Sequence, residues 1–472
     1  MTRKFTCNCR TDICLDMRLS AASFGLLGII LMTSCTEKPS IKTPLPVEIR
    51  TALEIASEKK LTVHYTTTVP VKRLEFVRSP DNQRLARWTA LQEEFQITHE
   101  DGVDYVSRKD DQSFSAAAFE SPMTYTVLPK DYAPFMPYSV GGVLLHSGRF
   151  QVCPESCMSD TAINEYPMQL FSNGYGDVIL NGEVLGMDAA WNDSRDGTMV
   201  YVGRSKPIET DHVIAIIDPK IPDDIKTMLN ALFPQMMDYY ADKLGSLNQK
   251  PMLFAALDRN SEPDGNPLSN NFSSQGGTLP GQVFMHLVGD GWLETLDVRG
   301  DYAGEFLAWF FAHEAAHLYQ RAADYESIGE DAWIHEGGAE AFAAITMREL
   351  ELASEARIET RKAQSVKKCL EGLQQGDLRT AGARQDFDLY YSCGMVIQLA
   401  AHKTVQFNGD KKGVFLLWQE FLEAQTQGDN WNENVFLSII EKKTDRKTMD
   451  LIGMIIEGDL TLDQKTLLDA IR

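Results

Sequence analysis

The sequence has little positive charge for its length. Its 472 residues include 45 Lys and Arg against 67 Asp and Glu, a formal net charge of −22 at pH 7. Proteins that bind nucleic acids need a basic face to displace counterions from the phosphate backbone, so this balance argues against that class. We therefore expect no nucleic-acid partner.

Long hydrophobic runs are also scarce. Only one stretch, near the N-terminus, is apolar enough to enter a membrane, which excludes a polytopic membrane protein. Hydrophobic residues nevertheless make up 43% of the chain and charged residues 24%, the usual balance of a folded protein with buried cores. The chain is therefore not disordered as a whole, and its length predicts two to three domains.

The N-terminal stretch has the pattern of an export signal. Arg18 provides a short positive region, Leu19 to Met32 is apolar, and small residues then lead to Cys35. This resembles a bacterial lipobox, whose cysteine becomes a lipidated N-terminus that holds the protein on a membrane surface. We expect residues 1–34 to be an upstream extension and a lipoprotein signal peptide. Lipidation of Cys35 would then anchor the protein in the cell envelope, facing the periplasm or the surface; an uncleaved anchor or an ordinary signal peptide is the alternative.

Cysteine is sparse downstream of this segment, where four cysteines remain. Exported proteins meet an oxidising compartment, in which four cysteines allow three disulfide pairings. The simplest pairing joins Cys153 to Cys157 and Cys369 to Cys393, since each pair lies within one region. A Cys-x-x-x-Cys metal site is the alternative for the first pair, although no second ligand pair lies near it.

Composition divides the rest of the chain into four segments. Residues 35–60 are expected to be the lipidated cysteine and a tether, because residues 36–46 are polar and rich in Pro. Residues 61–205 contain short β-branched or aromatic runs separated by Gly, Asn, Asp and Pro, which predict an all-β domain. Residues 206–348 alternate strands and helices, which predicts an α+β domain, and residues 349–472 are predicted to form a helical domain.

Within the α+β segment, individual elements can be located. A helix should begin near Pro222, run to about Leu244 and bend at Pro234. A second helix, Gly304 to Ala322, is apolar nearly all round and should be buried. The strands are expected at His212–Asp218, Pro251–Leu257 and Gly281–Val288.

The buried helix carries the pattern His313-Glu314-Ala315-Ala316-His317. Two histidines four residues apart lie on one helix face, so both imidazoles can reach one metal ion. The neighbouring Glu314 can address a water on that ion. Two structural histidines are the alternative, but burying two His and a Glu in an apolar helix without a partner is costly.

A second motif follows, Trp333-Ile334-His335-Glu336-Gly337-Gly338-Ala339, in which Glu336 stands after eighteen residues counted from His317. The Glu336 carboxylate offers a third ligand at the start of another apolar helix. Two His and one Glu leave the fourth position of a tetrahedral Zn²⁺ open to water, which is the arrangement of catalytic zinc.

Together these motifs resemble the gluzincin metallopeptidases, and are most similar to the aminopeptidase N family. The resemblance implies a thermolysin-like catalytic domain at residues 206–348. It also implies that His313, His317 and Glu336 bind one zinc ion and that Glu314 is the general base.

The family also has a tyrosine downstream that stabilises the tetrahedral intermediate. Tyr391 matches that context, with Tyr390 as the alternative, and a packed aromatic is the structural alternative for both. Glu340 lies one turn after Glu336 and could orient His313 by accepting its other N–H. It could equally be a helix-surface carboxylate.

One segment departs from the family. Its Gly-x-Met-Glu-Asn segment grips the free amine of the substrate, whereas this chain has Gly276-Gly277-Thr278-Leu279, with Leu279 at the Glu position. Gly276 and Gly277 are expected to bind the peptide backbone by strand addition, or to form a simple turn. Other acids could replace the missing anchor, namely Asp264, Glu294 or Glu305.

These observations predict a membrane-anchored zinc metallopeptidase that acts on a peptide or protein substrate. The missing amine anchor leaves endopeptidase activity open beside aminopeptidase activity. A zinc-containing binding lipoprotein without catalysis, and a hydrolase for non-peptide amides, are the other candidates.

Overall fold

The structure is a computed structural model, and it describes residues 47–57, 60–79, 83–123, 135–138, 142–157, 165–210, 213–247, 250–258, 273–288, 301–320, 331–426 and 432–472. The predicted export signal and Cys35 lie outside these residues, as do Asp264 and Glu294. Residues Val47–Arg472 cluster as one unit. Within the described ranges, no helix combines the length and apolar character needed to cross a membrane.

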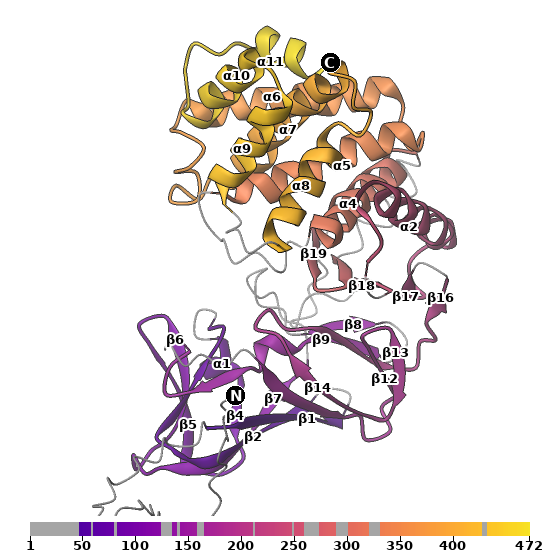
Figure 1. Cartoon of the computed structure of the whole chain (residues 1–472). Coiled ribbons are helices and arrows are strands. Elements are labelled where there is room, and N and C mark those ends of the chain that lie inside the picture. Colours follow the sequence, from indigo (N-terminus) through magenta and orange to yellow (C-terminus); the bar gives the residue numbers. More distant parts are fainter. Residues whose placement is uncertain are drawn as a thin grey trace, which may run out of the picture. The chain divides into compact units, whose positions relative to one another are not determined.

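The N-terminal half of this unit is built from strands, as predicted (Figure 1). They form a six-stranded sheet in the order β14-β11-β1-β2-β7-β4, a four-stranded sheet β10-β3-β6-β5 and a five-stranded sheet β13-β12-β15-β9-β8. The bounds are β1 Ile49–Ser57, β2 Lys60–Val71, β3 Arg73–Phe76, β4 Thr89–Ala90, β5 Phe95–Glu100, β6 Val103–Arg108, β7 Phe114–Pro122, β8 Phe135–Tyr138, β9 Gly142–His146, β10 Val152–Pro154, β11 Tyr166–Phe171, β12 Asp177–Leu180, β13 Glu183–Gly186, β14 Asp188–Asp193 and β15 Met199–Gly203. Among the described residues of this half are also the short helix α1 Gln83–Arg87 and the 3-10 helix η2 Ser147–Arg149.

The first strand corrects the predicted tether. Residues 35–60 were expected to be the lipidated cysteine and its tether, but β1 occupies Ile49–Ser57 and pairs with both β2 and β11 inside the sheet. Ile49, Leu53 and Ile55 are buried, while the residues between them are more exposed. This period of two is the signature of a half-buried strand. Polar residues at the alternate positions made the segment as a whole look like a linker.

The fourth sheet begins the α+β part of the chain. Its order is β16-β17-β18-β20-β19, in which β17, β18 and β20 run parallel and β19 is an antiparallel edge strand. The helix α2 begins and ends where the sequence predicts, and contains Pro234. The bounds are β16 Ile208–Glu209, β17 Ile214–Ile217, α2 Asp223–Leu244, β18 Met252–Asp258, β19 Ser273–Leu279 and β20 Gln282–Val288.

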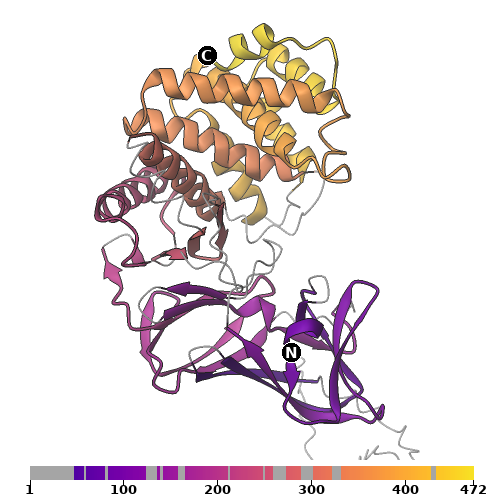
Figure 2. The ribbon, with the colours of Figure 1, turned by 180° about the vertical axis from the view of Figure 1, so that it is seen from behind.

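The rest of the described chain is helical, as predicted (Figure 2). One large core of buried side chains joins these helices to α2 and the fourth sheet. The contacts between α5 and α7 and between α4 and α5 are the most extensive among the helices. The bounds are α4 Asp301–Gln320, α5 Ala332–Glu349, α6 Glu355–Leu373, α7 Asp388–Phe407, α8 Val414–Thr426, α9 Glu433–Lys443, α10 Arg446–Ile456 and α11 Gln464–Ile471.

A continuous core joins the sheet β13-β12-β15-β9-β8 to the fourth sheet. Leu144, Tyr201 and Phe254 belong to one buried cluster that spans both. The Gln282 side chain adds two hydrogen bonds, since its Nε2 donates to the Met199 carbonyl at 2.9 Å and its Oε1 accepts from the Met199 N–H at 2.7 Å. The contact fixes the start of β15, and with it the preceding loop, against the α+β part.

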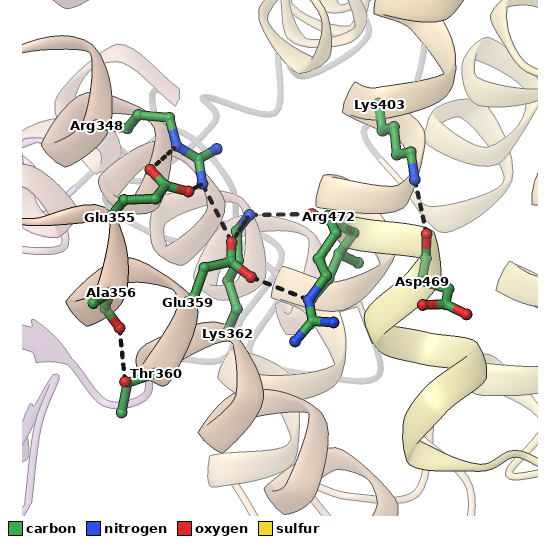
Figure 3. A network of polar contacts seen from close by, with 10 residues as sticks. Arg348, Glu355, Ala356, Glu359, Thr360, Lys362, Lys403, Asp469 and Arg472 are labelled. Carbon is green, nitrogen blue, oxygen red and sulfur yellow. Dashed lines mark hydrogen bonds and ion pairs between the residues drawn. The ribbon is translucent and has the colours of Figure 1, made fainter.

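Polar contacts attach the last helix to α6 (Figure 3). The Lys362 ammonium is buried and donates to the Glu359 carboxylate at 3.0 Å and to the Ile471 carbonyl at 3.1 Å. A buried ammonium needs such partners because leaving it unpaired costs several kcal/mol. The contacts therefore hold α11 on the helical core.

Two disulfides are present in the described residues. Cys153 is bonded to Cys157, and Cys369 on α6 is bonded to Cys393 on α7. This confirms the pairing that sequence proximity favoured, and the metal alternative for Cys153 and Cys157 is wrong.

Candidate zinc site

Helix α4 presents both histidines of the sequence motif to one point. Its other faces pack into the core, where Phe311, Ala315 and Ala316 are almost completely buried. His313 and His317 lie one turn apart on the remaining face, as the helical period requires. Their Nε2 atoms are 3.1 Å apart, so the two lone pairs converge.

Glu336 completes a triangle of ligand atoms. It lies in the first turns of α5, and its Oε2 is 3.4 Å from Nε2 of His313 and 3.3 Å from Nε2 of His317. Ligand atoms about 2.0–2.1 Å from a tetrahedral zinc ion are separated from one another by about 3.3–3.4 Å. The three residues therefore fit one zinc ion, and they form a candidate metal group in the described chain.

The close approach of α5 and α7 brings Glu336 and Tyr391 to the same place. A Cβ atom at Gly337 would collide with the Gly394 backbone, and a Cβ atom at Gly394 would collide with the Trp333 carbonyl. Glycine at both positions lets the two helix backbones touch. Glu336 precedes the first glycine and Tyr391 lies one turn before the second, so both side chains reach the site.

Two side chains contact the Nδ1 atoms of the histidines, which point away from the three converging ligand atoms. Glu340 Oε1 lies 3.3 Å from Nδ1 of His313, and its Oε2 accepts a hydrogen bond from Nε1 of Trp309 at 3.0 Å. The amide of Gln320 lies 3.0 Å from Nδ1 of His317. When Nε2 binds a metal, Nδ1 keeps its proton, and such partners fix the orientation of the ring.

The electrostatics of the site favour a cation. Burial acts to lower the pKa of His313, but hydrogen bonding to Glu336 and Glu340 raises it well above its usual range. Burial acts to raise the pKa of Glu336, but His317 and His313 hold it well below its usual range. By contrast, burial lowers the pKa of His335 to about 3, so His335 is neutral and carries no charge into the site.

Glu314 faces the same pocket and is held by a residue that the sequence did not single out. The Thr278 hydroxyl, on edge strand β19, lies 2.9 Å from Glu314 Oε2 and 2.9 Å from the Glu314 carbonyl. When the Thr278 hydroxyl donates to Oε2, it fixes the orientation of the Glu314 carboxylate, so that the other oxygen, Oε1, is the one left to contact a water molecule. Thr278 therefore positions Glu314 across the gap between strand and helix.

We expect Thr278→Val to lower kcat for peptide hydrolysis by about tenfold or more with little change in KM, because a hydrogen bond to a charged group is worth about 1.5–3 kcal/mol. Thr278→Ser keeps the hydroxyl and should retain most of the activity. Steady-state kinetics of both variants at equal zinc content check this. Equal activity of the Val and Ser variants would contradict it.

Tyr391 lines the same pocket and stacks on His313, one of the three candidate ligands. Its ring is 5.7 Å from the His313 ring, centroid to centroid, at an interplanar angle of 21°. Burial, together with the charges of Glu336 and Glu314, raises the pKa of Tyr391 well above its usual range. The phenol therefore keeps its proton and can donate a hydrogen bond. The alternative, Tyr390, is buried, and its hydroxyl accepts from the Gly382 N–H at 2.8 Å.

We expect Tyr391→Phe to lower kcat by about 10²–10³-fold, the usual cost of removing one donor to a developing oxyanion. Zinc content should be unchanged. Tyr390→Phe is the matched control and should change stability more than kcat. If Tyr390→Phe gave the larger loss of kcat at full zinc content, the assignment of the two tyrosines would be reversed.

The ligands open into a pocket of about 380 Å³. Edge strand β19 forms one wall of this pocket. The strand lies close against α4, because a Cβ atom at Gly276 would collide with the Phe310 ring of that helix. The glycines lie within the strand, so they do not form the simple turn considered from the sequence. The pocket is lined by Asp196, Gly276, Gly277, Thr278, Leu279, Pro280, His313, Glu314, His317, Ala332, His335, Glu336 and Tyr391.

Asp196 is the pocket residue that comes from the N-terminal strands. It lies in the loop between β14 and β15, and its Oδ1 accepts from Arg78 at 3.2 Å. Hydrogen bonds fix both ends of this loop. Ser147 Oγ accepts from the Thr198 N–H at 2.7 Å, and Gln151 Nε2 donates to Asp193 at 2.9 Å.

The remaining side chains differ in how far a sequence pattern could have identified them. Gln320 lies three residues after His317 on the same helix face, a spacing that could have identified it. Thr278 and Asp196 come from strands and loops far away in the sequence, and no spacing connects them to the zinc motif. Glu305, one suggested amine anchor, does not line this pocket but pairs with Arg357 at 2.9 Å.

Several solved structures are similar to this one in fold. The M1 zinc metallopeptidase from Deinococcus radiodurans matches with a TM-score of 0.50 and 11% identity over 89% of this chain and 95% of that chain. A mutant of an M1 zinc metallopeptidase from the same organism, bound to a Tyr-Ser-Ala substrate, gives a TM-score of 0.50 at 11% identity, with 88% and 94% covered. Yeast LTA4 hydrolase gives a TM-score of 0.48 at 9% identity, covering 89% of this chain and 67% of that chain.

No protein-family model and no curated protein matches the sequence. At these identities the structural similarity establishes the fold alone. The chain has a fold like that of the M1 zinc metallopeptidases, which confirms the coarse architecture predicted from the sequence.

Proposed function

We propose that this protein is a zinc metallopeptidase that hydrolyses peptide bonds. One observation carries the proposal: three ligand atoms 3.1–3.4 Å apart fit a zinc ion, and the Glu314 carboxylate faces the same pocket. The M1-like fold supports it. Bound zinc would polarise the scissile carbonyl and acidify a water molecule.

The protein's own groups would do the rest of the chemistry. Glu314, with one oxygen held by Thr278, accepts the proton of the attacking water and passes it to the leaving amine. Tyr391 donates its phenol proton in a hydrogen bond to the oxygen that becomes negative. Glu340 and Gln320 keep the imidazoles of His313 and His317 in a fixed orientation. In the described part of the chain β19 is an edge strand, and the substrate backbone would add to it as a further strand.

Whether the enzyme acts as an aminopeptidase or as an endopeptidase depends on whether a residue of the pocket binds the free N-terminal amine of the substrate. Leu279 lines the pocket where the family has a carboxylate, so that anchor is missing. Asp196 supplies a carboxylate in the same pocket, and no other acidic residue of the described lining remains once Glu314 and Glu336 have their roles. We therefore favour aminopeptidase activity with Asp196 as the amine-binding group, and endopeptidase activity is the alternative.

Matched peptides with free and acetylated N-termini test both statements. We expect chelator-sensitive cleavage that favours free N-termini, and Asp196→Asn should lower kcat/KM for free N-termini by about tenfold, an ordinary value for one charge-assisted contact. Asp111→Asn, at an exposed loop, is the control. Equal cleavage of both peptide forms would indicate an endopeptidase. Zinc binding without cleavage of any peptide would favour a binding lipoprotein or a non-peptide substrate.

We also propose that the protein is anchored to a membrane through lipid on Cys35. The proposal rests on the sequence pattern that ends at this residue. Mass spectrometry of the mature N-terminus tests it, and Cys35→Ala should release the protein from the membrane fraction.

A further inference from the structure

The first turn of α5, just before the candidate zinc ligand Glu336, meets the first turn of α9. Asp331 precedes α5 and does not cap that helix with its side chain; its Oδ2 accepts a hydrogen bond from the Glu433 N–H at 3.1 Å. Glu433 is the first residue of α9, so its N–H belongs to the donors that a helix leaves without an internal partner at its start. The two helices are therefore joined at their N-terminal ends.

Glu433 makes a second contact in the opposite direction. Its Oε2 accepts a hydrogen bond from Nε1 of Trp333 in α5 at 3.2 Å, and its Oε1 accepts from Nε of Arg379 at 2.9 Å. Both Glu433 and Trp333 are buried, and the Trp333 ring packs on Phe436 of α9 with 6.0 Å between ring centres. A buried indole N–H without an acceptor is costly, so the carboxylate and the indole hold each other in place.

The two carboxylates also suit the electrostatics of this junction. A helix N-terminus carries about half a positive charge, so two such ends that meet repel each other. Asp331 puts its carboxylate at the start of α9, and Glu433 puts its carboxylate beside the first turn of α5. This exchange offsets the repulsion and specifies which helix ends come together.

The position of Glu336, one turn beyond Trp333, has to be accurate. Ligand distances in a metal site should lie within about 0.2 Å of their usual values. Most buried residues of α5 are apolar, and hydrophobic burial has no preferred direction. Hydrogen bonds are directional, and a further one reaches this turn from α7, where Gln398 Nε2 donates to the Ile334 carbonyl at 2.6 Å. The bonds at the first turn are therefore suited to fixing Glu336 against the two histidines of α4.

We propose that Glu433 is a positioning residue for the zinc site: by holding Trp333 it fixes the first turn of α5 and thereby the place of Glu336. The inference rests on the zinc site of the proposed function. Glu433 is not among the residues that line the zinc pocket, so its effect on the metal passes through α5.

Zinc affinity and the visible spectrum of the cobalt-substituted protein test this role. Competition with a chromophoric chelator gives the zinc dissociation constant, and the d–d bands of Co²⁺ report the geometry of its ligands. Glu433→Ala and Trp333→Phe should each weaken zinc binding by about tenfold or more, as for partners outside a ligand set, and should change the Co²⁺ bands. The double variant should bind zinc no more weakly than the weaker single variant, because both changes remove the same hydrogen bond.

Glu420→Gln is the matched control, since it removes an ion pair with Lys443 at the other end of α9. It should match the parent in zinc affinity and in the Co²⁺ spectrum; an equal loss there would mean that any weakening of the helices has this effect, and the inference would be wrong. Parent-like affinity and spectrum in Glu433→Ala and Trp333→Phe would also overturn it while leaving the zinc site standing. Trp333→Phe, which keeps an aromatic ring, decides alone if Glu433→Ala does not fold. A parent that binds no zinc would refute both the proposed function and this inference.

Discussion

Replacing Glu314 by glutamine should abolish peptide hydrolysis and leave the zinc in place. Glutamine keeps the size and the hydrogen bond from the Thr278 hydroxyl, which lies 2.9 Å from Oε2 of Glu314, but it cannot accept a proton. General acid–base catalysis contributes about 10²–10⁴-fold, so kcat should fall by at least that range. Hydrolysis of a free-amine peptide and metal content by elemental analysis are measured on the same preparation.

The outcome separates two explanations of the site. Glu371→Gln, on the exposed side of α6, is the matched control and should retain full activity. If Glu314→Gln keeps substantial activity at full zinc content, another group accepts the proton and the proposed mechanism is wrong. If it loses zinc as well, Glu314 contributes to holding the metal rather than to the proton transfer alone.

Replacing His317 by alanine should have the opposite effect on the metal: zinc is lost, and activity is lost with it. His317 supplies one corner of the ligand triangle, 3.1 Å from His313 and 3.3 Å from Glu336. Its loss leaves two ligands, which is too few for a stable site. Removal of a partner outside the ligand set typically costs about 10–100-fold in metal affinity, and the loss of a ligand should cost more.

The neighbouring residue Gln320 gives a graded test of the same idea. Gln320→Ala removes the partner of Nδ1 of His317 and should weaken zinc binding by about 10–100-fold without abolishing it. His64→Ala, at an exposed histidine on β2, is the control and should bind zinc normally.

For the His317→Ala variant itself, zinc binding at the parent affinity would contradict the prediction, because the metal would then be held elsewhere.

The two predictions are distinct because they act on different properties. Glu314→Gln changes turnover at constant metal content, whereas His317→Ala changes metal content first. A protein that only binds zinc would show the second effect and no hydrolysis in the parent. The pair of experiments therefore tests the metal site and the chemistry separately.

Local sequence patterns determined the parts of the site that lie on single helices. The spacing of His313 and His317 places them one turn apart on α4 whatever the rest of the fold does. The apolar residues around them predict that the helix is buried, and α4 and α5 are found close to the predicted positions. Alternation of short β-branched runs likewise predicted the strands of the N-terminal half.

The same local reasoning failed where the pattern was ambiguous. Residues 49–57 alternate apolar and polar side chains, but they follow a Pro-rich segment, and that position favours a tether over a strand. Whether such a segment forms a strand depends on neighbours that offer hydrogen bonds, here β2 and β11, which lie elsewhere in the sequence.

By itself, then, the sequence determined the secondary structure of the long helices, the residues able to bind a metal and the disulfide partners that are close along the chain. Tertiary structure decided the rest: that Thr278 on β19 holds Glu314, that Tyr391 rather than Tyr390 faces the ligands, and that Asp196 enters the pocket. The reason is physical, since helical spacing is set by backbone geometry within a few residues. Contacts between separate strands and helices are set by how whole elements pack, and here glycines at Gly337 and Gly394 allow the approach that assembles the site.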